Sequence, residues 1–187
     1  FTVQFEPEEP IEELGWPASF DPAGRWAVYD NSDDIVLLDL RSSEIIPVAV
    51  TDAEEKSARF SPDGRWVAFI GPRDMTRYTR GLTQRVSLRA VDERGGDFSR
   101  LGDSFDGNVG IDFWSLDGNT IYFNQGIRTT EQLMALDVGS NTVRQLSDQD
   151  AQLNVSRDED SGVILITYSN GSTAPALYTV PSLDQVS

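Results

Sequence analysis

The chain has 187 residues, of which 39% are hydrophobic and 10% aromatic, so it can form the core of one folded domain. Its formal net charge of −16 argues against a nucleic-acid or anionic-membrane surface, because both require a basic face. The absence of cysteine excludes disulfides, cysteine–zinc sites and thiol catalysis, and no apolar run reaches the roughly 18 residues of a membrane helix.

The first elements expected along the chain are a strand at residues 1–5 and no more than one helical turn at residues 8–14. A hairpin follows at residues 18–29, with a tight turn that contains Pro22 and Gly24. Proline restricts φ to the value that the turn needs, glycine supplies a position with positive φ, and the flanking aromatic and β-branched residues favour strands.

The hairpin pattern recurs three more times. The turn glycines fall at positions 24, 64, 118 and 162, so the spacings are 40, 54 and 44 residues. A period of about 40–50 residues is typical of the blades of a β-propeller, and the longest spacing corresponds to one blade plus an insertion. The four copies are residues 18–29, 58–69, 111–123 and 153–166.

Further short strands follow each hairpin. Third strands are expected at residues 34–40, 85–91, 132–138 and 176–180, and outer strands at residues 45–50, 98–101 and 143–146. The fourth copy ends at Ser187, where its outer strand is expected.

The sequence therefore predicts an all-β chain that forms a partial β-propeller of about four four-stranded antiparallel blades. One propeller domain or fragment is expected to span residues 1–187, with blades at about residues 17–50, 57–102, 108–147 and 151–187. Short strands also suit a sandwich or a barrel, but neither requires one turn motif to recur at every fourth strand. A partial ring leaves unpaired strand edges, so self-association through open blade edges is expected.

The stretch FSPDGRWVAF at residues 60–69 resembles the SPDG repeat of the TolB and prolyl oligopeptidase/dipeptidyl peptidase propellers. Residues 131–147 and the stretch PALYTV at residues 175–180 are similar to other blade strands of these proteins. The resemblance covers about residues 16–180. The way the chain opens, and an insertion at residues 71–82, favour the N-terminal propeller of a prolyl oligopeptidase-like serine peptidase.

This resemblance implies a non-catalytic propeller domain that gates access and positions peptide substrate for an α/β-hydrolase domain outside this chain. The sequence contains no histidine and no G-x-S-x-G motif, so this chain alone cannot form the Ser-His-Asp triad of that family. One alternative is a TolB-like, non-enzymatic protein-interaction propeller in the periplasm. Another is a small self-contained propeller or lectin-like binding module. The compartment, cytoplasmic or periplasmic, stays open.

Seven of the 15 basic residues lie between positions 73 and 100, and all seven are arginines. The candidate substrate-binding residues are Arg73, Arg77, Tyr78 and Arg80 of the insertion. Guanidinium groups beside an aromatic ring can hold a peptide carboxylate or carbonyl. The same arginines could instead pair with surface acids or dock the hydrolase domain.

Two further polar patterns are interpreted as structural. The alternation of Arg85, Ser87 and Arg89 predicts the solvent-facing side of a strand. The oxygen-rich residues 30–34 lack the spacing of a calcium loop and favour a turn rich in Asp and Asn.

Other acids are interpreted as turn residues rather than as catalytic carboxylate pairs, because such acids are usually solvated. No catalytic residue, metal site or cofactor is therefore expected in this chain. These acids are the pairs and cluster at residues 33–34, 54–55 and 158–160, and the strand-ending Asp39, Asp92 and Asp137.

Overall fold

The computed structural model describes residue 14 and residues 16–31, 34–73, 83–91, 98–158 and 161–183. Regular structure in these ranges consists of fifteen β-strands, so the all-β prediction is confirmed. Within the same ranges, no helix has the length and apolarity that a membrane span requires. The strand expected at residues 1–5 and all but the last residue of the turn expected at residues 8–14 lie outside the described residues.

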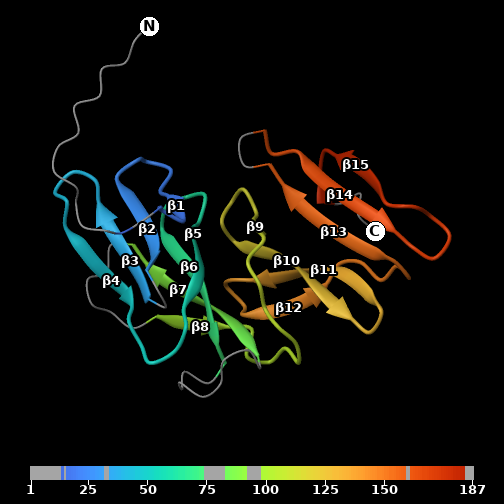
Figure 1. Ribbon diagram of the computed structural model, residues 1–187, viewed down its shortest axis with the longest axis horizontal. Coiled ribbons are helices and arrows are strands. Elements are labelled where there is room, and N and C mark those ends of the chain that lie inside the picture. Colours follow the sequence, from blue (N-terminus) through green and yellow to red (C-terminus); the bar gives the residue numbers. More distant parts are fainter. Residues whose placement is uncertain are drawn as a thin grey trace, which may run out of the picture.

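The first two sheets each contain four antiparallel strands in chain order (Figure 1). The first sheet comprises β1 (Ser19–Phe20), β2 (Trp26–Asn31), β3 (Asp34–Asp39) and β4 (Ile45–Ala49). The second sheet comprises β5 (Lys56–Phe60), β6 (Trp66–Pro72), β7 (Gln84–Ala90) and β8 (Ser99–Leu101).

The third sheet contains seven strands, in the order β15-β14-β13-β11-β10-β9 with β12 paired to β11. All its pairs are antiparallel except β11 with β13, which are parallel and are joined at the single pair Glu131–Gln152. Its strands are β9 (Phe113–Trp114), β10 (Thr120–Ile127), β11 (Thr130–Asp137), β12 (Thr142–Gln145), β13 (Gln152–Arg157), β14 (Ile164–Ser169) and β15 (Ala176–Val180).

The expected third and outer strands are all present to within two residues of their expected ends. Among the second strands, β10 differs most from its expected bounds, because it continues four residues beyond the expected end at Phe123. The added residues pair in unbroken register with β11, down to Ile127 opposite Thr130.

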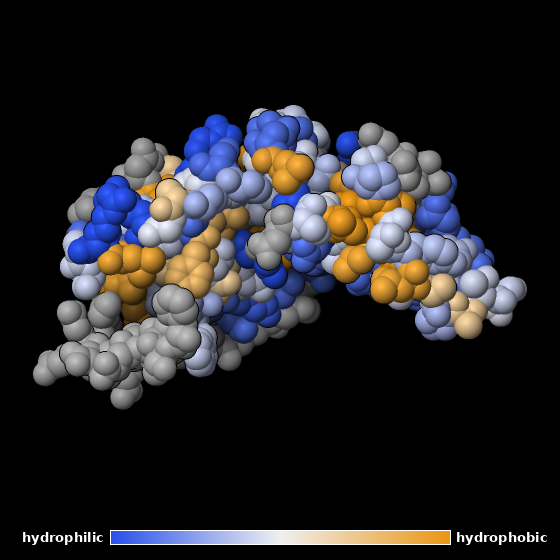
Figure 2. Space-filling view, turned by 90° about the horizontal axis from the view of Figure 1, so that it is seen from above, coloured by the Kyte–Doolittle hydropathy of each residue, from blue (hydrophilic) through white to orange (hydrophobic). Residues whose placement is uncertain are grey.

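The sheets pack face to face, one after another, along an arc (Figure 1). From the perpendicular direction the outline is an arch (Figure 2). Alternate residues of β6 show how one sheet serves two neighbours: Val67 and Phe69 pack against the first sheet, whereas Ala68 and Ile70 pack against the third. Because both faces of such a strand are buried, its sequence is continuously apolar rather than alternating.

The turn before each second strand has the geometry that the repeated glycine predicts. The φ angles of Gly24, Gly64, Gly118 and Gly162 are 65°, 69°, 70° and 72°. Successive turns also approach one another, because a Cβ atom on Gly118 would lie 2.9 Å from Asp63 Oδ2. A Cβ atom on Gly24 would meet nothing within 4 Å.

These two glycines provide a matched test of the contact between turns. Gly24→Ala should cost about 1–2 kcal/mol of unfolding free energy, because alanine is strained at positive φ. Gly118→Ala should cost about 1 kcal/mol more, because Asp63 must leave its hydrogen bonds with Ser61 Oγ (2.6 Å) and Arg65 N (3.0 Å). Urea denaturation of both variants measures the difference, and equal midpoints would contradict the contact.

Candidate functional site

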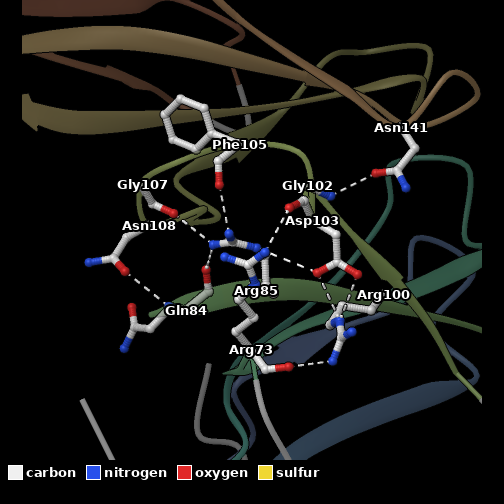
Figure 3. A network of polar contacts seen from close by, with 10 residues as sticks. All are labelled: Arg73, Gln84, Arg85, Arg100, Gly102, Asp103, Phe105, Gly107, Asn108 and Asn141. Atoms are coloured by element: carbon white, nitrogen blue, oxygen red, sulfur yellow. Dashed lines mark hydrogen bonds and ion pairs between the residues drawn. The ribbon is translucent and has the colours of Figure 1, made fainter. Parts of the chain in front are cut away.

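A network of hydrogen bonds and ion pairs surrounds Arg85, at the start of β7 (Figure 3). The side chain is fully buried under the loop that leads from β8 to β9. Its guanidinium donates to the carbonyl oxygens of Phe105 (2.7 Å), Gly107 (2.6 Å) and Gln84 (2.8 Å). Three carbonyl acceptors satisfy much of its hydrogen-bonding capacity, so Arg85 ties this loop to the second sheet.

Charged groups extend this network from the buried Arg85 to the partly exposed Asp103 and Arg100 (Figure 3). Asp103 lies 3.6 Å from Arg85 Nε and 3.0 Å from Arg100 Nε. Burial is the main cause that lowers the pKa of Arg85; the charges of Arg73 and Arg100 lower it further, and Asp103 opposes them. Asp103 thus sits among three arginines and offsets their mutual repulsion.

Backbone contacts complete the anchoring of the loop. Val109 N donates to Gln84 O (3.1 Å), and Gln84 N donates to Asn108 Oδ1 (2.9 Å). At the other end of the loop, Gly102 N donates to Asn141 Oδ1 (2.6 Å), from the turn between β11 and β12. The second and third sheets are therefore joined by hydrogen bonds as well as by their shared apolar core.

The prediction that Arg85, Ser87 and Arg89 face solvent is wrong. All three side chains are buried and lie on one face of β7. On this face Arg89 is opposite Val67 of β6, and Ser87 is opposite Phe69. The Arg89 guanidinium donates to the carbonyl oxygen of Pro47 in β4. Polar alternation here marks a face between two sheets, where backbone carbonyls replace water as hydrogen-bond partners.

Of the four predicted substrate-binding residues, only Arg73 lies in the described part of the chain. Arg73 Nη2 is 3.4 Å from the Asp103 carbonyl oxygen, and the Arg73 carbonyl accepts a hydrogen bond from Arg100. It therefore adjoins the Arg85 network. Arg77, Tyr78 and Arg80 lie outside the described residues, so their role stays a prediction.

An open pocket of about 540 Å³ lies between the first and second sheets, beside their hairpin turns. Two identical Gly-Arg-Trp triplets, residues 24–26 and 64–66, contribute most of the lining residues, which are Arg25, Trp26, Gly64, Arg65 and Trp66. The sequence pattern indicated only a turn and a strand at these residues. The signal that could have found the pocket is the exact repetition of the triplet at a 40-residue spacing.

Each arginine of this pocket is held by an acid of its own sheet. Arg25 Nη2 contacts Asp39 Oδ2 at 3.0 Å, and its guanidinium carbon lies 4.7 Å from the centre of the Trp26 ring. Arg65 Nε contacts Asp63 Oδ2 at 2.5 Å. Held guanidinium groups beside indole rings can donate to a carboxylate or a peptide carbonyl while the rings contact apolar groups.

The structure shows the hydrogen-bond partners of several acids that the sequence assigned to turns. The Asp39 carboxylate accepts from Arg41 N (2.8 Å), and the Asp137 carboxylate from Ser140 N (2.7 Å), so both initiate turns as predicted. Asp92 lies outside the described residues. Asp30 accepts from Ser57 N (2.7 Å) of the second sheet rather than from a turn of its own.

The interpretation of residues 54–55 as solvated turn acids is wrong for Glu55. Only 1% of Glu55 is exposed, and Thr51 Oγ1 donates to its carboxylate at 2.5 Å. No group of three or more potential metal ligands occurs in the part of the chain that the structure describes.

Solved structures with a similar fold include TolB proteins and a dipeptidyl peptidase. A TolB from Agrobacterium tumefaciens has a TM-score of 0.63 and 16% identity, over 90% of this chain and 58% of that chain. Porphyromonas gingivalis dipeptidyl peptidase 4 has a TM-score of 0.64 and 12% identity, over 91% of this chain and 32% of that chain. The fold is a β-propeller of the TolB and dipeptidyl peptidase kind.

A second TolB, from Acinetobacter baumannii, has a TM-score of 0.52 and 19% identity over 89% of this chain. This propeller chain spans 58%, 43% and 32% of the lengths of the Agrobacterium, Acinetobacter and Porphyromonas proteins. No protein-family model matches the sequence, and no curated protein does.

Replacing Arg85 tests the anchoring role of the buried guanidinium. Arg85→Leu should lower the free energy of unfolding by about 2–4 kcal/mol, because the Phe105 and Gly107 carbonyls lose a buried donor. Arg41→Leu, at an exposed turn position, should change it by no more than about 0.5 kcal/mol. Urea denaturation compares them, and similar midpoints for both variants would contradict the role.

The Asp39 carboxylate should give the stability a dependence on acidic pH. The hydrogen bond from Arg41 N is the largest cause that lowers its pKa from 3.8, and Arg25 lowers it too, against the effect of burial. Its stabilisation is complete above the unfolded pKa and is lost as the pH falls through the lower folded pKa. Asp39→Asn should therefore be less stable than the natural chain at pH 7, with the two converging below about pH 4.

Urea midpoints measured from pH 7 to pH 2 check this convergence, with Asp148→Asn, at an exposed position, as the matched control. A constant difference between Asp39→Asn and the natural chain across this range would contradict the assignment.

Proposed function

We propose that the chain is a partial propeller of four blades, in which the seven-stranded sheet comprises two blades. β9 to β12 form one antiparallel four-stranded unit, and β13 to β15 form the next. One parallel residue pair, Glu131–Gln152, joins them, whereas the antiparallel pairing of β13 with β14 extends over six residue pairs. The single bridge is a contact between blades rather than continuous sheet pairing.

The function that this geometry supports best is that of a non-catalytic domain of a prolyl oligopeptidase-like serine peptidase. Its role is to admit and position peptide substrate for a hydrolase domain outside residues 1–187. The pocket of the two Gly-Arg-Trp triplets carries this proposal, because Arg25 and Arg65 present donors for peptide carbonyls beside indole rings. The absence of histidine requires that the histidine of any Ser-His-Asp triad come from outside this chain.

Labelling of the intact gene product tests the enzyme assignment. The full-length protein, purified from its source, is treated with a fluorophosphonate probe, which modifies the nucleophile of active serine hydrolases. Labelling of a serine outside residues 1–187 is the expected result. Absence of labelling, in a protein that mass spectrometry shows to be intact, would contradict the peptidase assignment.

Substitution of the pocket then tests its role in the labelled enzyme. Arg65→Ala should raise KM for peptide substrates about three- to tenfold with little change in kcat, because it removes binding that ground state and transition state share. Arg144→Ala, at an exposed position of β12, is the matched control and should leave both constants unchanged. Equal effects of the two substitutions would show that the pocket does not bind substrate.

The second candidate is a TolB-like interaction propeller in the periplasm, which the two TolB structures favour. It predicts a signal peptide upstream, a small α/β domain beside the propeller, and no labelling by the fluorophosphonate probe. Partner proteins, in place of a peptide substrate, would then bind at the pocket of the two Gly-Arg-Trp triplets.

A further inference from the structure

A second pocket, of about 360 Å³, lies between the hairpin of β9 and β10 and the strands β13 and β14. Its volume is within the range of about 300–1,000 Å³ typical of ligand pockets. Phe113 and Tyr122 stack in its wall, with ring centres 5.0 Å apart and an interplanar angle of 25°. The lining also contains apolar side chains, among them Leu116, Ile164 and Leu183, and the polar residues Ser115, Asp117 and Ser182.

Arg157, the last residue of β13, is the cation in this lining. It alternates with Leu153 and Val155, which pack in the apolar cluster that contains Phe113. Its Nε atom is buried and has no hydrogen-bond partner, and no ion pair of Arg157 occurs among the described residues. A buried guanidinium nitrogen without an acceptor is unfavourable, so an anion that reached it would gain a charge-assisted hydrogen bond. Arg85 and Arg89 also have such an Nε atom, but their guanidinium groups donate to backbone carbonyl oxygens.

The repeat shows that this arginine is a departure from the pattern. In each hairpin, the turn glycine donates its N–H to the carbonyl of the first turn residue, which is Asp21 in the first copy and Asp158 in the fourth. The residue just before that position is Phe20, Phe60 and Trp114 in the first three copies, and Arg157 in the fourth. In the fourth copy a cation therefore occupies a position that is aromatic in the other three copies. The rings of Phe113 and Tyr122 line the same pocket.

Asp117 also lines this pocket and Asp158 directly follows Arg157; both carboxylates are engaged in turns. Asp117 accepts from Ser115 Oγ at 2.6 Å and from Asn119 N at 3.1 Å. Asp158 accepts from both the N–H (2.8 Å) and the hydroxyl (2.6 Å) of Ser161. Asp117 and Asp158 are therefore held by hydrogen bonds within their own turns, and the Arg157 Nε atom can donate to an anion as its partner.

We propose that this pocket binds an apolar monocarboxylate, with the carboxylate on Arg157 and the apolar body against Phe113, Tyr122 and Ile164. A planar guanidinium can bind a carboxylate with two parallel hydrogen bonds, and the stacked rings offer an apolar face. The carboxylate can come from the C-terminus of a peptide that ends in an apolar residue, or from a small free acid. This assignment does not depend on the proposed peptidase role.

Calorimetry with matched acids and amides tests the assignment. The probes are 3-phenylpropionate against 3-phenylpropanamide, and N-acetyl-Ala-Phe against its C-terminal amide. Each acid should bind at least about tenfold more tightly than its amide, because a charge-assisted hydrogen bond is lost in the amide. The source is a peptide terminus if N-acetyl-Ala-Phe binds more tightly than 3-phenylpropionate, and a small acid if the order is reversed.

Two variants and one control separate the charge from the apolar contact. Arg157→Gln should abolish the preference for acid over amide, whereas Arg144→Gln, from an exposed position of the same sheet, should retain it. Leu116→Ala should weaken acid and amide alike by a few-fold; Leu116 is 74% exposed, so this variant folds even if Arg157→Gln does not. Equal binding of acid and amide by the natural chain, or no binding of any probe at 5 mM, would overturn the proposal.

Discussion

The burial of both faces of each central sheet is the constraint on which the rest of this structure depends. A sheet with apolar side chains on both sides is stable only when another sheet covers each side. β6 shows the requirement most simply, because Val67 and Ala68 are adjacent, both fully buried, and belong to different apolar clusters. The arc of sheets follows from this requirement. Contact with one neighbouring sheet covers only one face of a sheet, so a second neighbour must cover the other face.

Polar contacts then set how neighbouring copies of the repeat meet, and they vary with the residue six positions after each turn glycine. In the first copy Asp30 accepts from Ser57 N and Ala58 N of the next sheet. In the third copy Asn124 bonds to both the N–H and the carbonyl of Val155, each at 2.9 Å. The second copy has the apolar Ile70 there, and at that joint Arg85 and its loop supply the polar link.

The repeat made the fold class and nearly all strand positions predictable, because turn chemistry and strand propensity are local properties. The burial of polar residues was not predictable, since it depends on which backbone carbonyls the neighbouring sheet presents. Arg85 and Arg89 looked solvent-exposed by alternation, yet each donates to carbonyls of a segment distant in sequence. Glu55 was misassigned for the same reason, because its environment is set by the packing of separate segments.

Both pockets lie beside hairpin turns, between neighbouring copies of the repeat, yet their arginines differ in one respect that bears on function. Arg25 and Arg65 belong to the repeated triplet, and each has an acid of its own sheet. Each acid already accepts hydrogen bonds from its arginine, so a ligand in that pocket can bind only to the guanidinium N–H groups that remain. Arg157 breaks the repeat and has a buried Nε atom without an acceptor. Because an unmet buried donor gains more from a new anion than a satisfied one does, we expect the Arg157 pocket to bind an anion more tightly than the pocket of the two triplets.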